Sequence, residues 1–474
     1  MNKIFTIALL IVSISVHAQS HNDSLKIKWF TLHFQQTFVE QYHPNFATST
    51  GSGDKSLSSS AESCLSSTTT MYVGARLWKN AEIYFNPEIA AGSGFSGATG
   101  VAGFTNGETF RVGSPAPSVY IARLFFRQTF NIGKEWYFRE EDQNKIPIML
   151  PVERVVITFG KFSISDIFDG NVTSHDPKTS LLNWSMMDAG AWDYPSNTRG
   201  YTYALSVKVQ KKQFTMRFCT AVASQWSNGM VTSGFVATPA DWLKSHGETV
   251  EIIVPIKKRN TIKLTMWANH ARMGSYKSAT QSLLIDTSAA NREVVGPTTG
   301  LNDGSSHLVS PALDSVRGKG GPYYGKLGIV LNWEMNLRND NSEKNMVFVR
   351  GSWNDGKRES WMYTEIDESL CAGAFFTADF IKRPDDIFRV AASVNGVSKD
   401  HAAYLKAGGY GFIIGDGLGH YPQGIKPEFI VEAQYNFKYK FLTITPDYQF
   451  IINPAYNPAR GPVNVLGLRA HFEI

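Results

Sequence analysis

The chain has 474 residues, of which 43% are hydrophobic, 13% aromatic and only 18% charged, and its 46 Lys and Arg against 41 Asp and Glu give a formal net charge of +5. So small a charge for this length does not indicate a nucleic-acid partner, and only three cysteines exclude a disulfide-scaffolded secreted domain. The lack of repeated apolar runs of about 20 residues excludes a polytopic helical membrane protein, and an aromatic-rich, glycine-rich, weakly charged composition is typical of an all-β chain.

Residues 1–18 have the three parts of a secretory signal peptide. A short basic start with Lys3 precedes an apolar stretch from Ile4 to Val16, and the small-residue rule for cleavage is met at Ala18. The apolar stretch is too short to span a bilayer, so we expect it to be removed after export. A buried N-terminal helix is the alternative. The mature chain, residues 19–474, is expected to form a single domain.

After the signal peptide, apolar and polar residues alternate, which is the period of a β-strand with two different faces. The clearest runs are 30–42, 201–209, 429–437 and 466–474. No segment has a long, clean helical period. The chain is therefore expected to be all-β.

Long polar connections alternate with short turns between these runs. The long connections are expected near 43–66, 93–117, 163–197, 226–248, 273–321, 355–368, 398–424 and 453–461. The short turns are expected near 79–80, 133–152, 210–212, 257–260, 337–345, 382–385 and 438–439, with 133–152 the longest of them. Eight long loops and seven turns predict about 16 strands, with both chain ends on the short-turn side.

This arrangement predicts a transmembrane antiparallel β-barrel in the outer membrane, with long extracellular loops. Backbone donors and acceptors in hydrocarbon must be paired internally, so a sheet crosses a membrane only as a closed ring. The apolar face would contact outer-membrane lipid and lipopolysaccharide, and the polar face would line a water-filled lumen. A secreted soluble β-protein that binds or hydrolyses glycans would show the same alternation with its apolar face inward, but it has no reason to alternate loop lengths regularly.

Short sequence motifs follow one another over nearly the whole mature chain. They are Tyr84-Phe85-Asn86-Pro87-Glu88, Ala122-Arg123-Leu124-Phe125, Asp166-Ile167-Phe168-Asp169, Gly190-Ala191-Trp192-Asp193-Tyr194-Pro195, Thr445-Pro446-Asp447-Tyr448-Gln449 and Arg460-Gly461-Pro462-Val463. Together they resemble the OprB-type carbohydrate-selective porin family. The resemblance implies a monomeric sixteen-stranded barrel that passes small sugars by facilitated diffusion.

Parity along the predicted strands places many arginines toward the lumen, where they avoid the roughly 2–4 kcal/mol that an arginine facing lipid costs at the midplane. The same parity assigns Tyr120 to the lipid face. The expected constriction consists of Arg76, Glu88, Glu108, Arg111, Arg123 and Arg127. The remaining expected pore-lining residues of the strands are Arg217, Arg350 and Glu432.

These residue types suit neutral polyols. Guanidinium forks donate pairs of hydrogen bonds, carboxylates accept them, and a flat aromatic ring packs on the C–H face of a sugar. Trp192 and Tyr194 are the candidate stacking residues if the 163–197 loop folds into the lumen. For each arginine the alternative is pairing with a lumen carboxylate that only stiffens the wall, and Trp192 could equally anchor the loop. Residues expected at the membrane interfaces are Trp78, Trp136, Trp267, Trp333 and Tyr439.

No pattern in the sequence indicates catalysis or a cofactor. The acidic groups at 140–142 and 385–386 lie in predicted turns, and the histidines lack metal-ligand spacing. We therefore expect no enzyme activity, no cofactor and no metal. The partners expected are small sugars and the lipid and lipopolysaccharide of the outer membrane. A general porin without sugar preference remains the nearest alternative.

Overall fold

The computed structural model describes residues 27–474 apart from 54, 110, 112–114, 225–226, 228–235, 258, 286–293, 296–307, 310–312, 314–322, 339–344 and 363. The predicted signal peptide lies outside the described residues.

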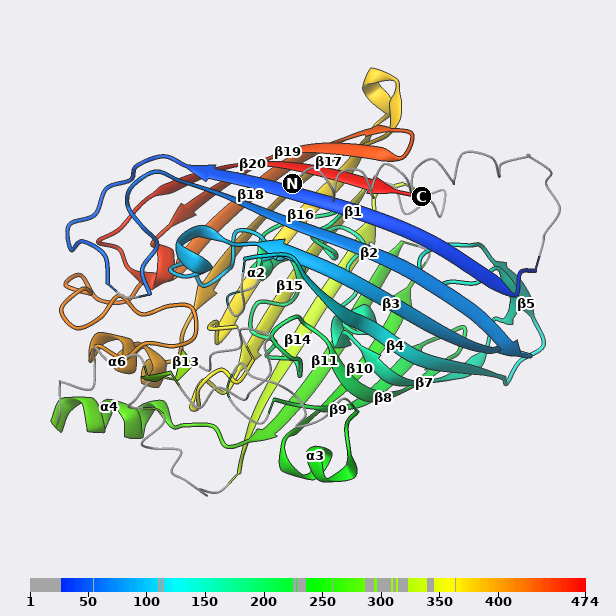
Figure 1. Ribbon diagram of the computed structural model, residues 1–474, viewed down its shortest axis with the longest axis horizontal. Coiled ribbons are helices and arrows are strands. Elements are labelled where there is room, and N and C mark those ends of the chain that lie inside the picture. The colour runs from blue at the N-terminus through cyan, green and yellow to red at the C-terminus, as the bar shows by residue number, and fades with distance from the viewer. Residues whose placement is uncertain are drawn as a thin grey trace.

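The main sheet is a closed antiparallel barrel of 16 strands, which confirms the fold predicted from the alternation. Its strands are β1 (Phe30–His43), β2 (Glu62–Trp78), β3 (Ala81–Gly92), β4 (Ser118–Asn131), β7 (Arg154–Phe162), β8 (Thr202–Gln210), β9 (Thr215–Val222), β10 (His246–Ile256), β11 (Asn260–Ala271), β14 (Tyr324–Asn336), β15 (Met346–Asn354), β16 (Glu368–Ala378), β17 (Arg383–Gly396), β18 (Glu428–Tyr439), β19 (Leu442–Ile452) and β20 (Val463–Glu473). The strands are strongly tilted (Figure 1). Among the described residues, no helix is long and apolar enough to cross a membrane.

The first and last strands close the ring. β1 pairs antiparallel with β20, from Gln35 opposite Glu473 to Tyr42 opposite Leu466, and Figure 1 shows the two strands side by side. Closure leaves no strand of the barrel with an unpaired edge, which is the condition for a sheet in hydrocarbon.

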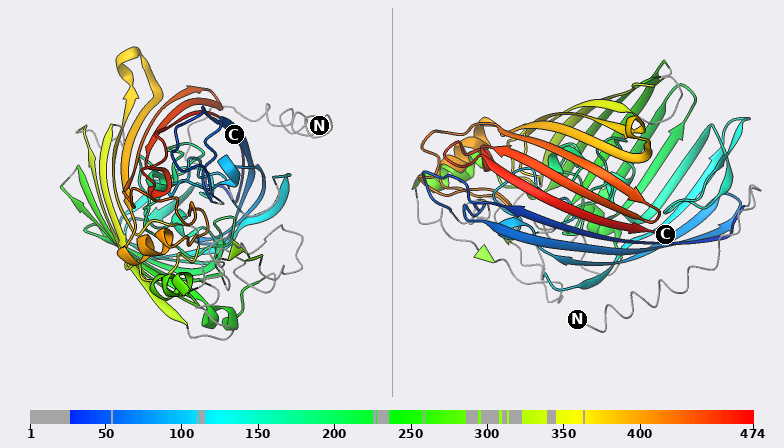
Figure 2. Two further views of the ribbon diagram at one scale, coloured as in Figure 1. Left: turned by 90° about the vertical axis from the view of Figure 1, so that its left-hand side faces the viewer. Right: turned by 90° about the horizontal axis from the view of Figure 1, so that it is seen from above.

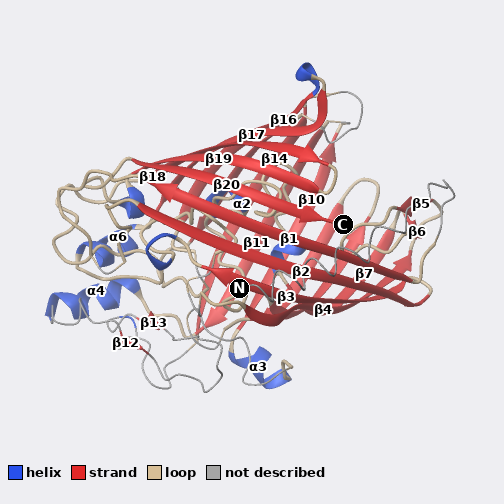
Figure 3. Cartoon of the chain, turned by 45° about the horizontal axis from the view of Figure 1, so that its top comes forward, coloured by secondary structure: helices blue, strands red, loops and turns tan. Residues whose placement is uncertain are grey.

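The long loops gather at one end of the barrel together with most of the helices (Figure 3). The helices are α2 (Trp184–Met187), α3 (Pro239–Lys244), α4 (Tyr276–Ile285) and α6 (Lys399–Lys406), with short 3-10 turns η1 (Phe95–Gly97), η2 (Ile164–Asp166), η4 (Asp379–Ile381) and η5 (Pro454–Tyr456). The long-loop region also holds the two-residue strands β12 (Val294–Val295) and β13 (Leu308–Val309). At the opposite end, η4 lies in the tight connection between β16 and β17.

One connection at the turn end departs from the expected short turn. Residues 132–153 contain a separate hairpin, β5 (Trp136–Arg139) paired with β6 (Ile148–Pro151). Its tip lies against the inner face of β3, because the Asn144 amide nitrogen donates to the Asn86 side-chain oxygen at 3.0 Å and the Tyr84 hydroxyl accepts from the Ile146 N–H at 3.3 Å. This connection therefore occupies part of the lumen.

The two faces of the strands differ as the alternation predicts. On β20, Leu466 and Leu468 are exposed on the outside, and Arg469 and His471, which have the opposite parity, are buried inside. Trp267 is an exception to the interface assignment, which was wrong for this residue: it is only 4% exposed and belongs to the buried cluster inside the barrel. Its parity on β11 matches inward Thr265 and Asn269, so the indole faces the lumen.

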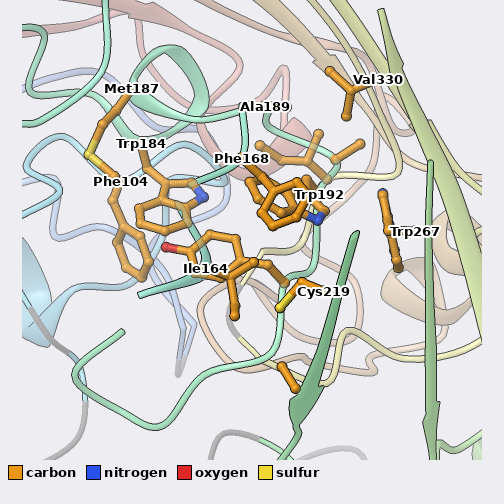
Figure 4. Packing of buried hydrophobic residues seen from close by; sticks show 14 of the residues in the cluster. Phe104, Ile164, Phe168, Trp184, Met187, Ala189, Trp192, Cys219, Trp267 and Val330 are labelled. Atoms are coloured by element: carbon orange, nitrogen blue, oxygen red, sulfur yellow. The ribbon is translucent and has the colours of Figure 1, made fainter. Parts of the chain in front are cut away.

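Chain segments from the long loops fill much of the lumen (Figure 2). The 163–201 loop carries the largest share, with helix α2 and Trp192 fully buried. Trp192 packs in an apolar cluster with Phe168, Trp184 and Trp267 (Figure 4). The hydrophobic core of this protein thus lies inside the barrel, between the wall and the loops.

Candidate functional site

A cavity of about 420 Å³ lies between the inner face of β2, β3 and β4 and the loops inside the barrel. Arg111 and residues 196–201 line it from the long-loop end, whereas residues 143–145 line it from the β5–β6 hairpin at the turn end. Segments that enter the barrel from both ends therefore line one hollow.

Hydroxyl groups surround a carboxylate in the wall of this cavity. Glu88 is only 3% exposed, and it accepts hydrogen bonds from the Tyr201 hydroxyl at 3.0 Å and from the hydroxyls of Tyr120 and Thr70. Among the described residues, no Lys or Arg forms an ion pair with Glu88. Three hydroxyl donors therefore fix this carboxyl group at the cavity wall.

The assignment of Tyr120 to the lipid face by strand parity is wrong. Asn86 pairs with Arg123, but the next residue, Pro87, pairs with Ile121, so Ala122 is an extra residue in β4. Proline lacks the N–H that a ladder needs and is found in strands mainly at edges and bulges. The bulge reverses the facing of the residues before it, and Tyr120 lines the cavity instead of facing lipid.

Arg123 is held flat across the cavity by two partners. Its guanidinium donates to both Asp166 oxygens, at 2.7 and 2.6 Å, and lies 5.1 Å from the centre of the Tyr201 ring. Asp166 is fixed in turn, since it accepts from the Ser163 N–H at 3.2 Å at the start of the 163–201 loop. This bidentate pair joins the β4 wall to that loop.

Arg127, two positions past the inward Phe125, faces the turn end of the cavity. Its guanidinium is 5.2 Å from the centres of both the Tyr84 and Phe125 rings and donates to the Asn144 carbonyl at 3.3 Å. No carboxylate pairs with it among the described residues. It therefore presents positive charge that the protein does not neutralise locally.

Glu108 and Lys178 form an ion pair of 3.0 Å between two loops on the opposite side of the cavity. Burial lowers the pKa of Lys178, but the Glu108 and Asp176 carboxylates outweigh it and raise that pKa well above its ordinary value. Conversely, burial raises the pKa of Asp176, and the Lys178 ammonium outweighs it, so this pKa is lowered. Lys178 and Asp176 are therefore both charged at neutral pH.

Aromatic rings complete the lining. The Trp184 and Tyr194 rings stack at 5.9 Å with 25° between their planes, and both line the cavity. The Arg111 side chain donates to the Phe412 carbonyl at 2.5 Å and lies over its ring. Trp192 is 0% exposed and does not line the cavity; it packs the inward-folded loop, the alternative considered for it.

Besides Trp192, four of the expected pore residues do not line this cavity. Arg76 lies at the turn end of β2, over the Trp29 ring at 4.6 Å. Arg217, Arg350 and Glu432 do face inward, but each of them binds the 163–201 loop. This difference arises because the loop folds onto three sides of the lumen wall and covers them.

The contacts of these three residues fasten the loop. Arg350 donates to Asp169 at 2.9 Å and to the Asp188 carbonyl at 2.7 Å. Glu432 accepts from the Leu182 and Asn183 N–H groups at 2.6 and 2.9 Å. Arg217 donates to the Ile167 carbonyl and to Glu251. Wall cations thus bind loop carbonyls, and wall carboxylates bind loop amides.

Several lining residues escaped the sequence analysis: Tyr72, Tyr120, Asn144, Asp166, Lys178, Trp184 and Tyr201. For Tyr120 the proline at position 87 was a usable signal of a bulge. The run 201–209 placed Tyr201 on the apolar face, which was wrong, because β8 begins only at Thr202 and strand parity does not hold for Tyr201. The loop residues had no signal, because their positions depend on contacts far away in the sequence.

This arrangement offers donors, acceptors and flat rings to a polar solute, and it holds no nucleophile–base pair among the contacts above. Within the described part of the chain, no group of three or more His, Cys, Asp or Glu is placed to hold a metal ion.

The model of the family described as carbohydrate-selective porin, OprB family, matches residues 64–474. Among solved structures, the high-pH structure of Pseudomonas putida OprB has a TM-score of 0.61 at 15% identity, covering 94% of this chain and 94% of that chain. The outer membrane channel DcaP of Acinetobacter baumannii has a TM-score of 0.48 at 8% identity, covering 94% of this chain and 97% of that chain. At these identities the likeness to solved structures shows the fold alone. A comparison with curated proteins found no match.

Proposed function

The chain belongs to the OprB family of carbohydrate-selective porins, and from that premise we propose that small sugars diffuse passively through it along the cavity beside β2, β3 and β4. A porin of this family resides in the outer membrane, which is incompatible with the secreted soluble protein that the sequence left open. We propose further that residues 1–18 direct export and that residues 19–474 form the barrel domain.

The single observation that carries the proposal is that segments from both ends of the barrel line the cavity. Its lining includes long-loop residues such as Arg111 and turn-end residues such as Lys145. In an outer-membrane barrel the long loops are extracellular and the turns periplasmic. A solute in this cavity would therefore contact segments that enter from both sides of the membrane, which supports passage along it.

The lining chemistry supports a sugar as the solute. Arg123 and Arg127 can donate to hydroxyl groups, and the Glu88 and Glu108 carboxylates can accept from them. The Tyr194 and Trp184 rings offer apolar faces to a pyranose ring. We assign Arg111 to the extracellular mouth of this path, since it lies in the 93–117 loop.

The site is suited to passage because its own groups already bind one another. Arg123 is engaged by Asp166, and Lys178 is engaged by Glu108. A sugar exchanges hydrogen bonds with groups that are satisfied without it, so its net affinity is small. Weak binding favours entry and still permits release, which is the requirement for conduction.

One barrel encloses one complete path, so we propose that a monomer in contact with outer-membrane lipid and lipopolysaccharide is sufficient. As a porin it is a channel, and the proposal includes no catalysed reaction and no cofactor.

The test is a comparison of neutral sugars with polyols of matched size in liposome swelling, together with sugar block of ion current in a planar bilayer. We expect swelling with mono- and disaccharides, faster than with the matched polyols, and block of current by millimolar sugar. Liposomes without protein give the baseline. Equal rates for sugars and polyols with no current block would identify a general porin, the nearest alternative, and remove the selective function.

A further inference from the structure

Five cationic side chains gather on the inner wall toward the turn end of the barrel. We call them the basic cluster: Arg127 on β4, Arg139 on β5, Arg154 on β7, Lys208 on β8 and Arg217 on β9. All but Arg139 come from consecutive wall strands. Because Arg127 also lines the cavity, the basic cluster borders the proposed sugar path at its periplasmic end.

Lys208 lies at the centre of this cluster. It is directly opposite Arg217 in the β8–β9 register, and like charges in opposed positions destabilise a sheet. The charged groups around its side chain are those of Arg154, Arg217, Arg127 and Arg139. Lys208 is half-buried and faces the lumen.

The protein compensates only part of this charge. Glu82 pairs with Arg139 and Glu251 pairs with Arg217. Arg154 donates to the Pro151 and Val152 carbonyls at 2.8 and 3.3 Å and lies over the Tyr137 ring at 5.2 Å. Among the described residues, no carboxylate forms an ion pair with Arg127, Arg154 or Lys208, so these three basic side chains lack an anionic partner.

Two buried donors in the cluster also lack an acceptor. The Nε atoms of Arg154 and Arg217 are buried and have no hydrogen-bond partner within the described protein. An unsatisfied buried donor costs free energy, and a charged one costs more. Both guanidinium groups therefore keep unused donor capacity beside the uncompensated charge.

The cavity wall nearer the long loops is arranged differently. There Arg123 pairs with Asp166 and Lys178 pairs with Glu108. Positive charge around Arg123 and Lys178 is therefore paired, whereas Arg127, Arg154 and Lys208 at the turn end have no carboxylate in an ion pair among the described residues.

We propose that the basic cluster binds the oxyanion of an acidic sugar, either the carboxylate of a hexuronate or the phosphate of a sugar phosphate, as that sugar leaves the cavity. This inference rests on the proposed sugar path. Guanidinium forks match the paired oxygens of both oxyanions, and the Lys208 ammonium adds a point charge. An anionic sugar can then contact the cavity with its ring and the basic cluster with its charged group.

The experiment uses the full-length protein in planar bilayers and measures block of ion current by glucose, glucuronate and glucose 6-phosphate added on the turn side. We expect the two charged sugars to block at about tenfold lower concentration than glucose, the factor that one charge-assisted contact supplies. Inorganic phosphate should compete with them.

Lys208→Gln should remove most of the difference between the charged sugars and glucose. Lys212→Gln is the matched control, because Lys212 is an exposed lysine of the neighbouring turn that pairs with Glu135 outside the cluster. Lys212→Gln makes the same change of charge and should leave the difference in blocking concentration between glucose and the charged sugars intact. Heat-modifiable migration on a gel checks that each variant is folded, and the wild-type comparison needs no variant.

The outcomes distinguish failure of the anion site from failure of the sugar path. Block by only one of the charged sugars supports the site and identifies its oxyanion. Equal block by glucose and both charged sugars in the wild type, or an unchanged difference in folded Lys208→Gln, overturns the anion site while leaving the sugar path in place. Failure of every sugar to enter removes the path and the site together.

Discussion

Arg123 and Arg127 point into the same cavity from one strand, but their surroundings differ. Arg123 is neutralised by Asp166, and Arg127 is covered by the Tyr84 and Phe125 rings without a carboxylate. Arg123 can act on a sugar mainly through directed hydrogen bonds. Arg127 also adds to the electrostatic potential of the path, which favours anions.

Replacing both, Arg123→Ala with Arg127→Ala, should therefore change two properties at once. We expect sugar block to weaken by about tenfold, as the loss of one or two hydrogen bonds from charged groups predicts. We also expect the reversal potential in a salt gradient to shift away from anion preference. Lys211→Ala with Lys212→Ala removes the same charge from an exposed turn and is the control. If block and reversal potential both stay at wild-type values, these arginines do not form the constriction.

The sequence predicted the inward facing of Glu88, Arg123 and Arg127 because strand parity is a local property. It could not predict the facing of Tyr120 without the bulge opposite Pro87. Arg350 and Glu432 were placed on the correct face, but their covering by the 163–201 loop depends on contacts between distant parts of the chain. Parity therefore identifies lumen residues and does not tell which of them meet solvent.

At the scale of elements, the strands were more predictable than the connections. A lipid-facing strand must keep an apolar face along its whole length, and this requirement leaves a regular pattern in the sequence. A loop inside the lumen needs only partners for its backbone, and Glu432 and Arg350 supply them from strands that are far away in sequence. The β5–β6 hairpin illustrates the consequence, since its residues suggested only a long turn.

That hairpin narrows the turn end of the path, so shortening it should widen the path. Replacement of residues 135–150 by an Asn-Gly turn, combined with Glu82→Gln so that no carboxylate is left without its Arg139 partner, should raise single-channel conductance and reduce sugar selectivity. The physical reason is the loss of residues 143–145 from the cavity lining. Single-channel recordings measure both effects.

A second variant separates the bulk of the hairpin from its side chains. Asn144→Ala with Lys145→Ala keeps the hairpin, whose packing rests on Ile146, Ile148 and Leu150, and should change conductance much less than the shortened connection. Unaltered conductance after shortening would mean that the narrowest part of the path lies elsewhere.

At the scale of the whole molecule, the closed ring and the filled lumen answer two different requirements. Closure pairs the backbone of every barrel strand in a medium without water. Filling reduces the space enclosed by the ring to a cavity along one wall, because the loops pack a hydrophobic core against the rest of the wall. The family membership confirms the resemblance seen in the sequence, while the position of the cavity follows only from the loop packing.

This filling predicts a sharp limit on solute size. A cavity of about 420 Å³ is at the lower end of the roughly 300–1,000 Å³ that enclose ordinary small ligands. Mono- and disaccharides should therefore pass, and linear tetrasaccharides should be excluded, in liposome swelling with an oligosaccharide series of one sugar type.

The proposed size limit is set by the loops and not by the ring of strands, so weakening a loop attachment should relax it. In Glu432→Ala the Leu182 and Asn183 amides lose their acceptor, and we expect longer oligosaccharides to enter while the barrel keeps its heat-modifiable migration. Passage of tetrasaccharides through the wild-type protein would show that the loops move aside during transport and that the cavity does not set the size limit.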